Sequence, residues 1–301
     1  MERGERLTLV LKTSPDRSGV AAAIAAVAIW GMVPVALRYF IAFLDPFAFS
    51  TIRFGSSALF ALPLFLWARP WTWPPRDIAR TALCGFLSLP GLNIPNVLAA
   101  RTIPAGGIGL ITATEPIFII LFGLLALRAS LTWRIAIGAA IALAGVALAM
   151  SHGTAALFDI GNLGNVGFGL LGAASWGAYT VIGAPLARKY GAYRYTGAVL
   201  VIGGAITVAL LAPVLPADSW PSSAVFGQIS VLSLFSSLLG FLLWNHGASL
   251  MSPQLIGPLL YLIPVFGIIG GIVFLSEPLT WQMALGGSVI LAGVAIGEGR
   301  V

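Results

Sequence analysis

Long apolar runs, interrupted by Gly, Pro and charged residues, dominate this sequence. A helix needs roughly 20 apolar residues to cross a bilayer core of about 30 Å. From Ser219 to Ser276 there is no Asp, Glu, Lys or Arg, and this run is far too long for one span. The chain must therefore turn inside it, and the polar stretch from Asn245 to Pro253 is the expected turn.

The same interruptions along the whole chain predict an all-α integral membrane protein with ten transmembrane helices. A β-barrel would need alternating strands of about ten residues, and no such alternation is present. The predicted spans are residues 19–40, 46–68, 80–101, 104–127, 131–150, 163–187, 194–214, 222–244, 253–275 and 279–298.

Composition agrees with a protein whose surface faces lipid. Of 301 residues, 58% are hydrophobic and only 9% are charged, whereas soluble proteins carry about 25% charged residues. The net charge of +6 does not indicate a nucleic-acid partner, because the basic residues are spread through short loops. There is no ATP-binding motif, and no cofactor is expected. The single cysteine, Cys84, excludes an intrachain disulfide.

The first 18 residues are polar and predict a cytoplasmic tail ahead of a signal-anchor helix. A cleaved signal peptide is the alternative, because basic residues precede an Ala-rich stretch. The run from Gly19 to Leu37 is long for the apolar region of a signal peptide, which favours the anchor.

Basic residues predict the orientation, because Lys and Arg favour the cytoplasmic side of short loops. The connections 151–162 and 215–221 contain neither residue. Both termini are therefore expected in the cytoplasm of a multi-pass protein of the bacterial inner membrane. The basic residues on that side would be Arg3, Arg6, Lys12, Arg17, Arg69, Arg76, Arg80, Arg128, Arg134, Arg188, Lys189, Arg194 and Arg300.

An internal repeat is the most informative feature. Residues 131–148 and 279–296 are identical at ten of eighteen positions, at an offset of 148. The same offset places Pro116 on Pro264, and Trp30-Gly31 recurs as Trp176-Gly177 at an offset of 146.

The repeat predicts two five-helix units, at residues 19–150 and 163–298. An odd number of spans per unit means that the second unit enters the membrane from the opposite side. Inverted repeats are typical of transporters that work by alternating access. The alternative is a duplication that only enlarged a scaffold.

Several short motifs follow one another along nearly the whole chain: Trp30-Gly31, Arg53-Phe54, Glu115-Pro116, the run from Ser276 to Trp281, and the run from Leu291 to Ala295. In their order and spacing these motifs resemble the drug/metabolite transporter superfamily, EamA-type branch. Within this branch the chain resembles bacterial amino-acid exporters, including the aromatic amino-acid exporter group. The resemblance implies export of neutral or aromatic amino acids through a cavity between spans 1, 3, 4, 6, 8 and 9.

One position departs from the family pattern. The second unit has Glu277 before Pro278, whereas the first unit reads Arg128-Ala129-Ser130 at the corresponding place. The acidic position is therefore missing from the first half, and no role is carried over to it.

Polar residues deep in the membrane are the candidate functional residues. In the third span, Pro90 and Pro95 should kink or break the helix. Asn93 and Asn96 are three residues apart and share a face there. They could bind the polar head of a small zwitterion, or they could hydrogen-bond neighbouring helices.

Large aromatic residues in mid-span are the second group, because Trp and Tyr usually prefer the membrane interfaces. Trp30, Trp176 and Tyr179 could line a cavity with apolar walls, and plain packing is the alternative. Tyr261 in span nine is a candidate of the same kind.

Span eight carries a small polar face of Ser230, Ser233 and Ser237, at helical spacing. Helix packing explains this face most simply, and Ser237 is its candidate substrate-binding residue.

Glu115 is the only acidic residue deep in any span, and it is the candidate for proton coupling. It could be neutral in a dry conformation and charged in a wet one. It could equally accept hydrogen bonds from a neighbouring helix beside a bend at Pro116. Arg38 and Arg53 lie nearer the external edge and could attract anions to the outer mouth.

Other classes of protein fit less well. An enzyme would need a nucleophile or a metal set, yet there is no HExxH or GxSxG motif, and His152 and His246 are expected at opposite membrane faces. A lipid or glycolipid flippase of the same fold is the main alternative. A non-transporting accessory subunit comes next. A nucleotide-sugar or phosphate exchanger ranks lower, because it would need several deep basic residues and only Arg38 and Arg53 are available. The expected partners are a small-molecule substrate and membrane lipid, with the oligomeric state open.

Overall fold

The computed structural model describes residues 16–40, 44–103, 105–127, 131–151, 160–276 and 278–297. Within these residues the regular elements are all helical. The first half contains α1 (Arg17–Phe40), α2 (Pro46–Ala68), α3 (Pro75–Ser88), α4 (Pro90–Ala99), α5 (Ala105–Thr112), α6 (Glu115–Leu127) and α7 (Trp133–Ala149). The second half contains α8 (Leu163–Tyr190), α9 (Ala192–Leu211), α10 (Ser223–Ser233), the π-helix η6 (Leu234–Leu239), α11 (Gly240–Leu250), α12 (Pro253–Ile256), the 3-10 helix η7 (Gly257–Leu262), α13 (Ile263–Leu275) and α14 (Trp281–Gly297).

Eight segments of the described chain are long and apolar enough to cross a membrane, and the shorter apolar helices α7 and α14 complete the ten. The prediction of an all-α protein with ten spans is confirmed. The turn between the eighth and ninth spans lies inside the expected stretch from Asn245 to Pro253, but it is shorter than predicted, because α11 continues to Leu250 and the turn is confined to Met251 and Ser252. Asn245 can stay in the helix because its side chain is hydrogen-bonded inside the protein.

Proline sets the local breaks of the third span, as expected. The ring of Pro90 cannot continue a helix that arrives from Ser88, so α3 ends and α4 begins around Leu89. Pro95 stays inside α4. The break is therefore made by the first proline alone.

The fourth span of each repeat is interrupted at an equivalent proline. A turn at Ala113 and Thr114 separates α5 from α6, and Pro116 then occupies the first turn of α6. In the second repeat η7 leads into α13, whose first turn holds Pro264. Proline fits a first turn because the N–H that it lacks has no partner there anyway. Both repeats thus begin a helix within the span.

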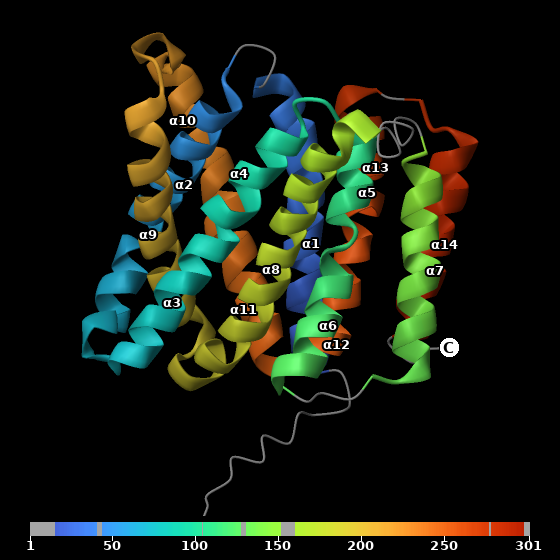
Figure 1. The fold of residues 1–301 in the computed structure, drawn as a ribbon, viewed down its shortest axis with the longest axis horizontal. Helices are drawn as coiled ribbons and strands as arrows, with labels where there is room; N and C mark the ends of the chain where they lie inside the picture. Colours follow the sequence, from blue (N-terminus) through green and yellow to red (C-terminus); the bar gives the residue numbers. More distant parts are fainter. Residues whose placement is uncertain are drawn as a thin grey trace, which may run out of the picture.

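The helices pack in pairs related by a twofold pattern. Helix α1 packs on α11 and α13, whereas α8 packs on the equivalent α4 and α6. Helix α2 pairs with α9, and α7 pairs with α14. Figure 1 shows these last two pairs at opposite flanks of the bundle, with the two helices of each pair running in opposite directions. The two five-helix units are therefore inverted, and the chain enters α1 and leaves α14 at the same end of the bundle.

Glycines allow the closest approaches between the two repeats. A Cβ on Gly31 of α1 would lie 2.5 Å from the Cβ of Phe266, and a Cβ on Gly177 of α8 would lie 2.6 Å from that of Phe118. These contacts are repeat equivalents of each other. Between α7 and α14 the same relation links Gly138 with Gly293 and Gly145 with Gly286. In lipid, where apolar burial gives no driving force between helices, such contacts supply the packing energy.

This packing predicts opposite effects at two adjacent glycines of α14. A Cβ on Gly286 would lie 2.6 Å from the backbone N of Ala149, whereas one on Gly287 would meet nothing within 4 Å. We expect Gly286→Ala to destabilise the protein by about 1–3 kcal/mol through overpacking. Gly287→Ala should be neutral or slightly stabilising, because Ala favours a helix over Gly. Thermal unfolding of the purified proteins in detergent measures both, and equal melting temperatures would contradict this packing.

Candidate functional site

Five aromatic rings meet at the centre of the bundle, where α1 and α8 approach α11. The rings of Trp30 and Trp176, equivalent in the two repeats, are 5.2 Å apart in an edge-to-face arrangement. Phe241 lies 5.8 Å from Trp30 and 5.6 Å from Trp176, and Trp244 lies 5.5 Å and 5.9 Å from them. Tyr179 lies 5.0 Å from Trp176. Three of the predicted site residues thus belong to one cluster, called here the central aromatic cluster.

The π-helix η6 connects this cluster to a half-buried arginine, Arg53. The Trp30 Nε1 donates a hydrogen bond of 2.8 Å to the carbonyl oxygen of Ser236. The next residue, Ser237, is fully buried and accepts a hydrogen bond of 3.3 Å from the Nε of Arg53. A π-helix inserts an extra residue into an α-helix and occurs frequently at functional sites. Arg53 therefore reaches the segment beside the cluster, from a position that the sequence suggested to be nearer the external edge.

All three serines of the predicted polar face point to α2. The Ser230 Oγ lies 2.9 Å from the Oγ of Ser56, and the Ser233 Oγ donates to the carbonyl oxygen of Arg53 at 2.5 Å. Ser237, the third serine, contacts α2 through the hydrogen bond that it accepts from the Arg53 side chain. The face joins α2 to α10 and η6, and Ser237 is its member closest to the cluster along the chain.

Asn245 is a buried polar residue that the sequence analysis did not select. Its Oδ1 accepts a hydrogen bond of 2.8 Å from the Tyr179 hydroxyl, and its Nδ2 donates to the Thr196 Oγ1 at 2.9 Å. The internal repeat contains a signal that could have identified Asn245. At an offset of 149, Ser88, Gly91 and Asn96 fall on Ser237, Gly240 and Asn245. The offset exceeds 148 by one residue, as expected if the π-helix adds one.

Several buried polar atoms beside the cluster have no hydrogen-bond partner within the described residues. They are the Asn96 Oδ1, the Trp176 Nε1, the Thr180 Oγ1 and the Trp244 Nε1. Asn96 lies against Gly172, where an added Cβ would be 2.9 Å from its Oδ1. Residues 172, 176 and 180 share one face of α8 by their helical spacing. Buried polar groups are almost always paired, so this row of donors and acceptors indicates a place for a polar ligand.

Two other predicted residues lie apart from this row. The Asn93 Nδ2 donates to the Leu89 carbonyl oxygen at 2.9 Å, which supports the break before α4. Tyr261 is buried in η7 and lines an apolar cavity of about 360 Å³ between α6 and α7. A substrate role for Asn93 and Tyr261 stays a prediction.

Glu115 is the first residue of α6 and is only 8% exposed. Among the described residues its carboxyl group has no hydrogen bond to another side chain. The start of a helix favours a carboxylate through its free N–H groups, so a structural role remains consistent with this position. The Arg38 side chain, His152 and Glu277 lie outside the described residues.

In the described part of the chain, no three His, Cys, Asp or Glu residues gather so that they could hold an ion. The central aromatic cluster supplies apolar walls, and the atoms beside it supply hydrogen-bond donors and acceptors. Such a site can bind a small amphipathic molecule by its apolar part and orient it by its polar part.

Ten spans in two inverted repeats are typical of a multi-pass membrane transporter. Residues 17–151 and 164–296 each match the model of the EamA-like transporter family. The two matches together cover most of the chain, which belongs to this family.

Curated relatives support the same class. An "Uncharacterized transporter" of Archaeoglobus fulgidus is 26% identical over 90% of this chain and 95% of its own. The "Uncharacterized inner membrane transporter YedA" of Escherichia coli K12 is 27% identical over 90% and 88%. A "Probable terminal-alkyne amino-acid exporter" of Streptantibioticus cattleyicolor is 24% identical over 73% of each chain.

A solved crystal structure has the same fold. It superposes with a TM-score of 0.80 over 93% of this chain and 96% of its own, at 18% sequence identity. At that identity the likeness concerns the fold alone.

Proposed function

We propose that this transporter exports small amphipathic metabolites, and that neutral or aromatic amino acids are its substrates, by alternating access. The observation that carries the proposal is the row of unpartnered polar atoms beside the central aromatic cluster. The amino-acid exporter of S. cattleyicolor is consistent with this substrate class.

The two ends of an amino-acid head group match the atoms of the row. The Asn96 Oδ1 is an acceptor for an ammonium group, and the Trp176 and Trp244 Nε1 atoms are donors for a carboxylate. An aromatic or aliphatic side chain would pack among the rings, where edge-to-face contacts stabilise it. The rings pack tightly on one another, so the substrate must enter when the two repeats tilt apart.

Arg53 completes the recognition of the carboxylate in this proposal. Its Nε makes only a long hydrogen bond to Ser237, and its guanidinium lies 5.1 Å from the Phe54 ring. Within the described residues it has no acidic partner, so its positive charge is available to an anion. One deep arginine suits a single carboxylate better than the several charges of a nucleotide sugar.

A lipid or glycolipid flippase of the same fold is the alternative. A flippase needs a wide apolar opening toward the membrane, whereas Trp176, Tyr179 and Trp244 are almost fully buried. The cluster is therefore not exposed to lipid, which supports a small solute over a lipid as the substrate.

We propose that both termini lie in the cytoplasm, because the basic loop residues gather at the end where α2 leads into α3 and α8 into α9. In a Cys84→Ala background, a cysteine at Tyr193 should resist a membrane-impermeant thiol reagent in intact cells. A cysteine at Ser222, which precedes α10 at the other end of the bundle in Figure 1, should react. Both side chains are exposed. The reverse labelling pattern would contradict the proposed orientation.

Transport in liposomes tests the site. We expect purified protein to exchange labelled phenylalanine or leucine, within a panel of amino acids. Trp176→Phe keeps an aromatic ring but removes the Nε1 donor. Exchange should therefore fall about five- to tenfold, which corresponds to the loss of one hydrogen bond. Arg53→Gln should reduce it about thirtyfold, because a charge-assisted bond is stronger, and Arg53→Lys should fall in between.

Trp133→Phe is the matched control, because Trp133 is 67% exposed and far from the cluster along the chain. Melting temperatures in detergent identify any variant that has lost its fold. Wild-type exchange in folded Trp176→Phe and Arg53→Gln would refute the proposed site, whereas no amino-acid transport at all would refute the substrate class.

We further propose that Glu115 couples proton movement to substrate movement. Glu115→Gln keeps the shape of the side chain and fixes it neutral. We expect the variant to retain substrate exchange but to lose the stimulation of transport by an imposed pH gradient. Asp218→Asn, at an exposed carboxyl group, is the control. If Glu115→Gln keeps the wild-type rate and pH dependence, Glu115 is structural and the protein works as a uniporter.

A further inference from the structure

A second site lies at the basic end of the bundle, away from the central aromatic cluster. It is a cavity of about 740 Å³ between the α2–α3 connection and the end of α8 with the start of α9. Three basic side chains line it, those of Arg69, Lys189 and Arg194. The lining also includes the aromatic residues Trp67, Trp73 and Tyr190.

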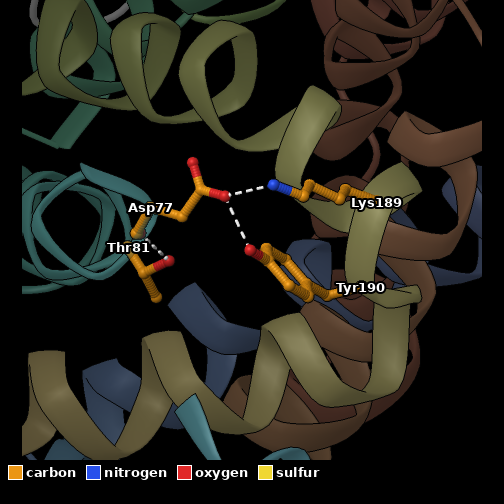
Figure 2. A network of polar contacts seen from close by, with 4 residues as sticks. All are labelled: Asp77, Thr81, Lys189 and Tyr190. Atoms are coloured by element: carbon orange, nitrogen blue, oxygen red, sulfur yellow. Dashed lines mark hydrogen bonds and ion pairs between the residues drawn. The ribbon is translucent and has the colours of Figure 1, made fainter. Parts of the chain in front are cut away.

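Hydrogen bonds and ring stacking fix one wall of this basic cavity. Figure 2 shows Asp77 of α3 accepting hydrogen bonds from the Lys189 Nζ and the Tyr190 hydroxyl, both at 2.6 Å. The rings of Trp73 and Tyr190 stack at 3.7 Å, nearly parallel at 9°. The wall is therefore ordered before any ligand arrives, which lowers the entropy cost of binding.

The charge of the cavity is only partly compensated. Asp77 neutralises Lys189, but neither Arg69 nor Arg194 has an acidic partner in the described part of the chain. The Arg194 guanidinium lies over the Trp67 ring, 4.5 Å from its centroid. Arg69 ends α2 as its left-handed C-cap, with a φ of 48°, and its side chain is exposed. Two guanidinium groups thus remain available to an anion.

The rim of the cavity shows what kind of anion fits. Leu66 and Trp67 line the cavity and are 54% and 55% exposed, and Trp71 is 58% exposed on the same connection. On a membrane protein such residues face lipid, and tryptophan prefers the level of the head groups. A soluble phosphate would gain nothing from this apolar rim. A phospholipid would place its phosphate on the arginines and its chains along the rim.

We propose that this cavity binds the head group of an anionic phospholipid. Phosphate suits the two arginines because guanidinium groups bind phosphate oxygens in pairs. Basic pockets at the cytoplasmic side of membrane proteins recognise anionic head groups in this way. The site is independent of the central aromatic cluster, and it ties the α2–α3 connection of the first repeat to α8 and α9 of the second.

Native mass spectrometry of the purified protein with added lipid tests this proposal. The probes are dioleoylphosphatidylglycerol and dioleoylphosphatidylcholine at equal concentration. We expect wild-type protein to retain phosphatidylglycerol preferentially. The double variant Arg69→Gln/Arg194→Gln should weaken retention about fivefold for each arginine lost. Arg134→Gln is the matched control, because Arg134 also lies over an exposed tryptophan ring, that of Trp133 at 5.5 Å, outside the cavity.

The outcomes separate the possible ligands. Equal retention of the two lipids by wild-type protein would overturn the proposal, and this comparison needs no variant. Unchanged retention by the folded double variant, or equal loss in Arg134→Gln, would overturn it as well. A thermal stabilisation by inorganic phosphate as large as that by phosphatidylglycerol would assign the cavity to a soluble anion instead.

Discussion

Close backbone contact at glycine is the constraint on which the rest of this structure depends. Helices in lipid gain no net hydrophobic energy by associating, so packing at short range must hold them together. Gly31 against Phe266 and Gly177 against Phe118 bring the first helix of each repeat onto the fourth span of the other. Trp30 and Trp176 each stand one residue before such a glycine, and their side chains meet at 5.2 Å between ring centroids. The central aromatic cluster thus lies directly beside the two glycine contacts.

The polar chemistry of the site differs between the repeats although the packing does not. Glu115 corresponds to Ile263, while Pro116 and Pro264 make the same break in both halves. Tyr179, which donates to Asn245, corresponds to Val33 at the offset of 146. The helices of the two repeats therefore pack symmetrically, whereas the polar side chains of the site are arranged asymmetrically. A substrate with two different ends requires such a site.

The sequence predicted the frame well and the site in part. Span ends were predictable because they depend on length, apolar runs and proline, as α2 and the ninth span illustrate. Trp30, Trp176 and Tyr179 were predicted as candidates from their mid-span positions, and the repeat related the two tryptophans, but their meeting in one cluster was not predicted. Asn245 was not predicted, because an asparagine beside a histidine resembles a turn unless its buried partner is known. The reach of Arg53 to Ser237 was also missed, because the π-helix that positions Ser237 is set by tertiary contacts such as the bond from Trp30.

The pairing of α7 with α14 has a consequence for how such a chain could arise. Gly138 and Gly145 of α7 pack against Gly293 and Gly286 of α14, and the two helices come from opposite repeats. In a single five-helix ancestor, the glycines of this last helix would face lipid. A second copy, inserted beside it in the opposite orientation, would cover them. Such an ancestor would have needed both orientations in one membrane. Fusion of two copies removes that need, because each half can then evolve loop charges that commit it to one orientation.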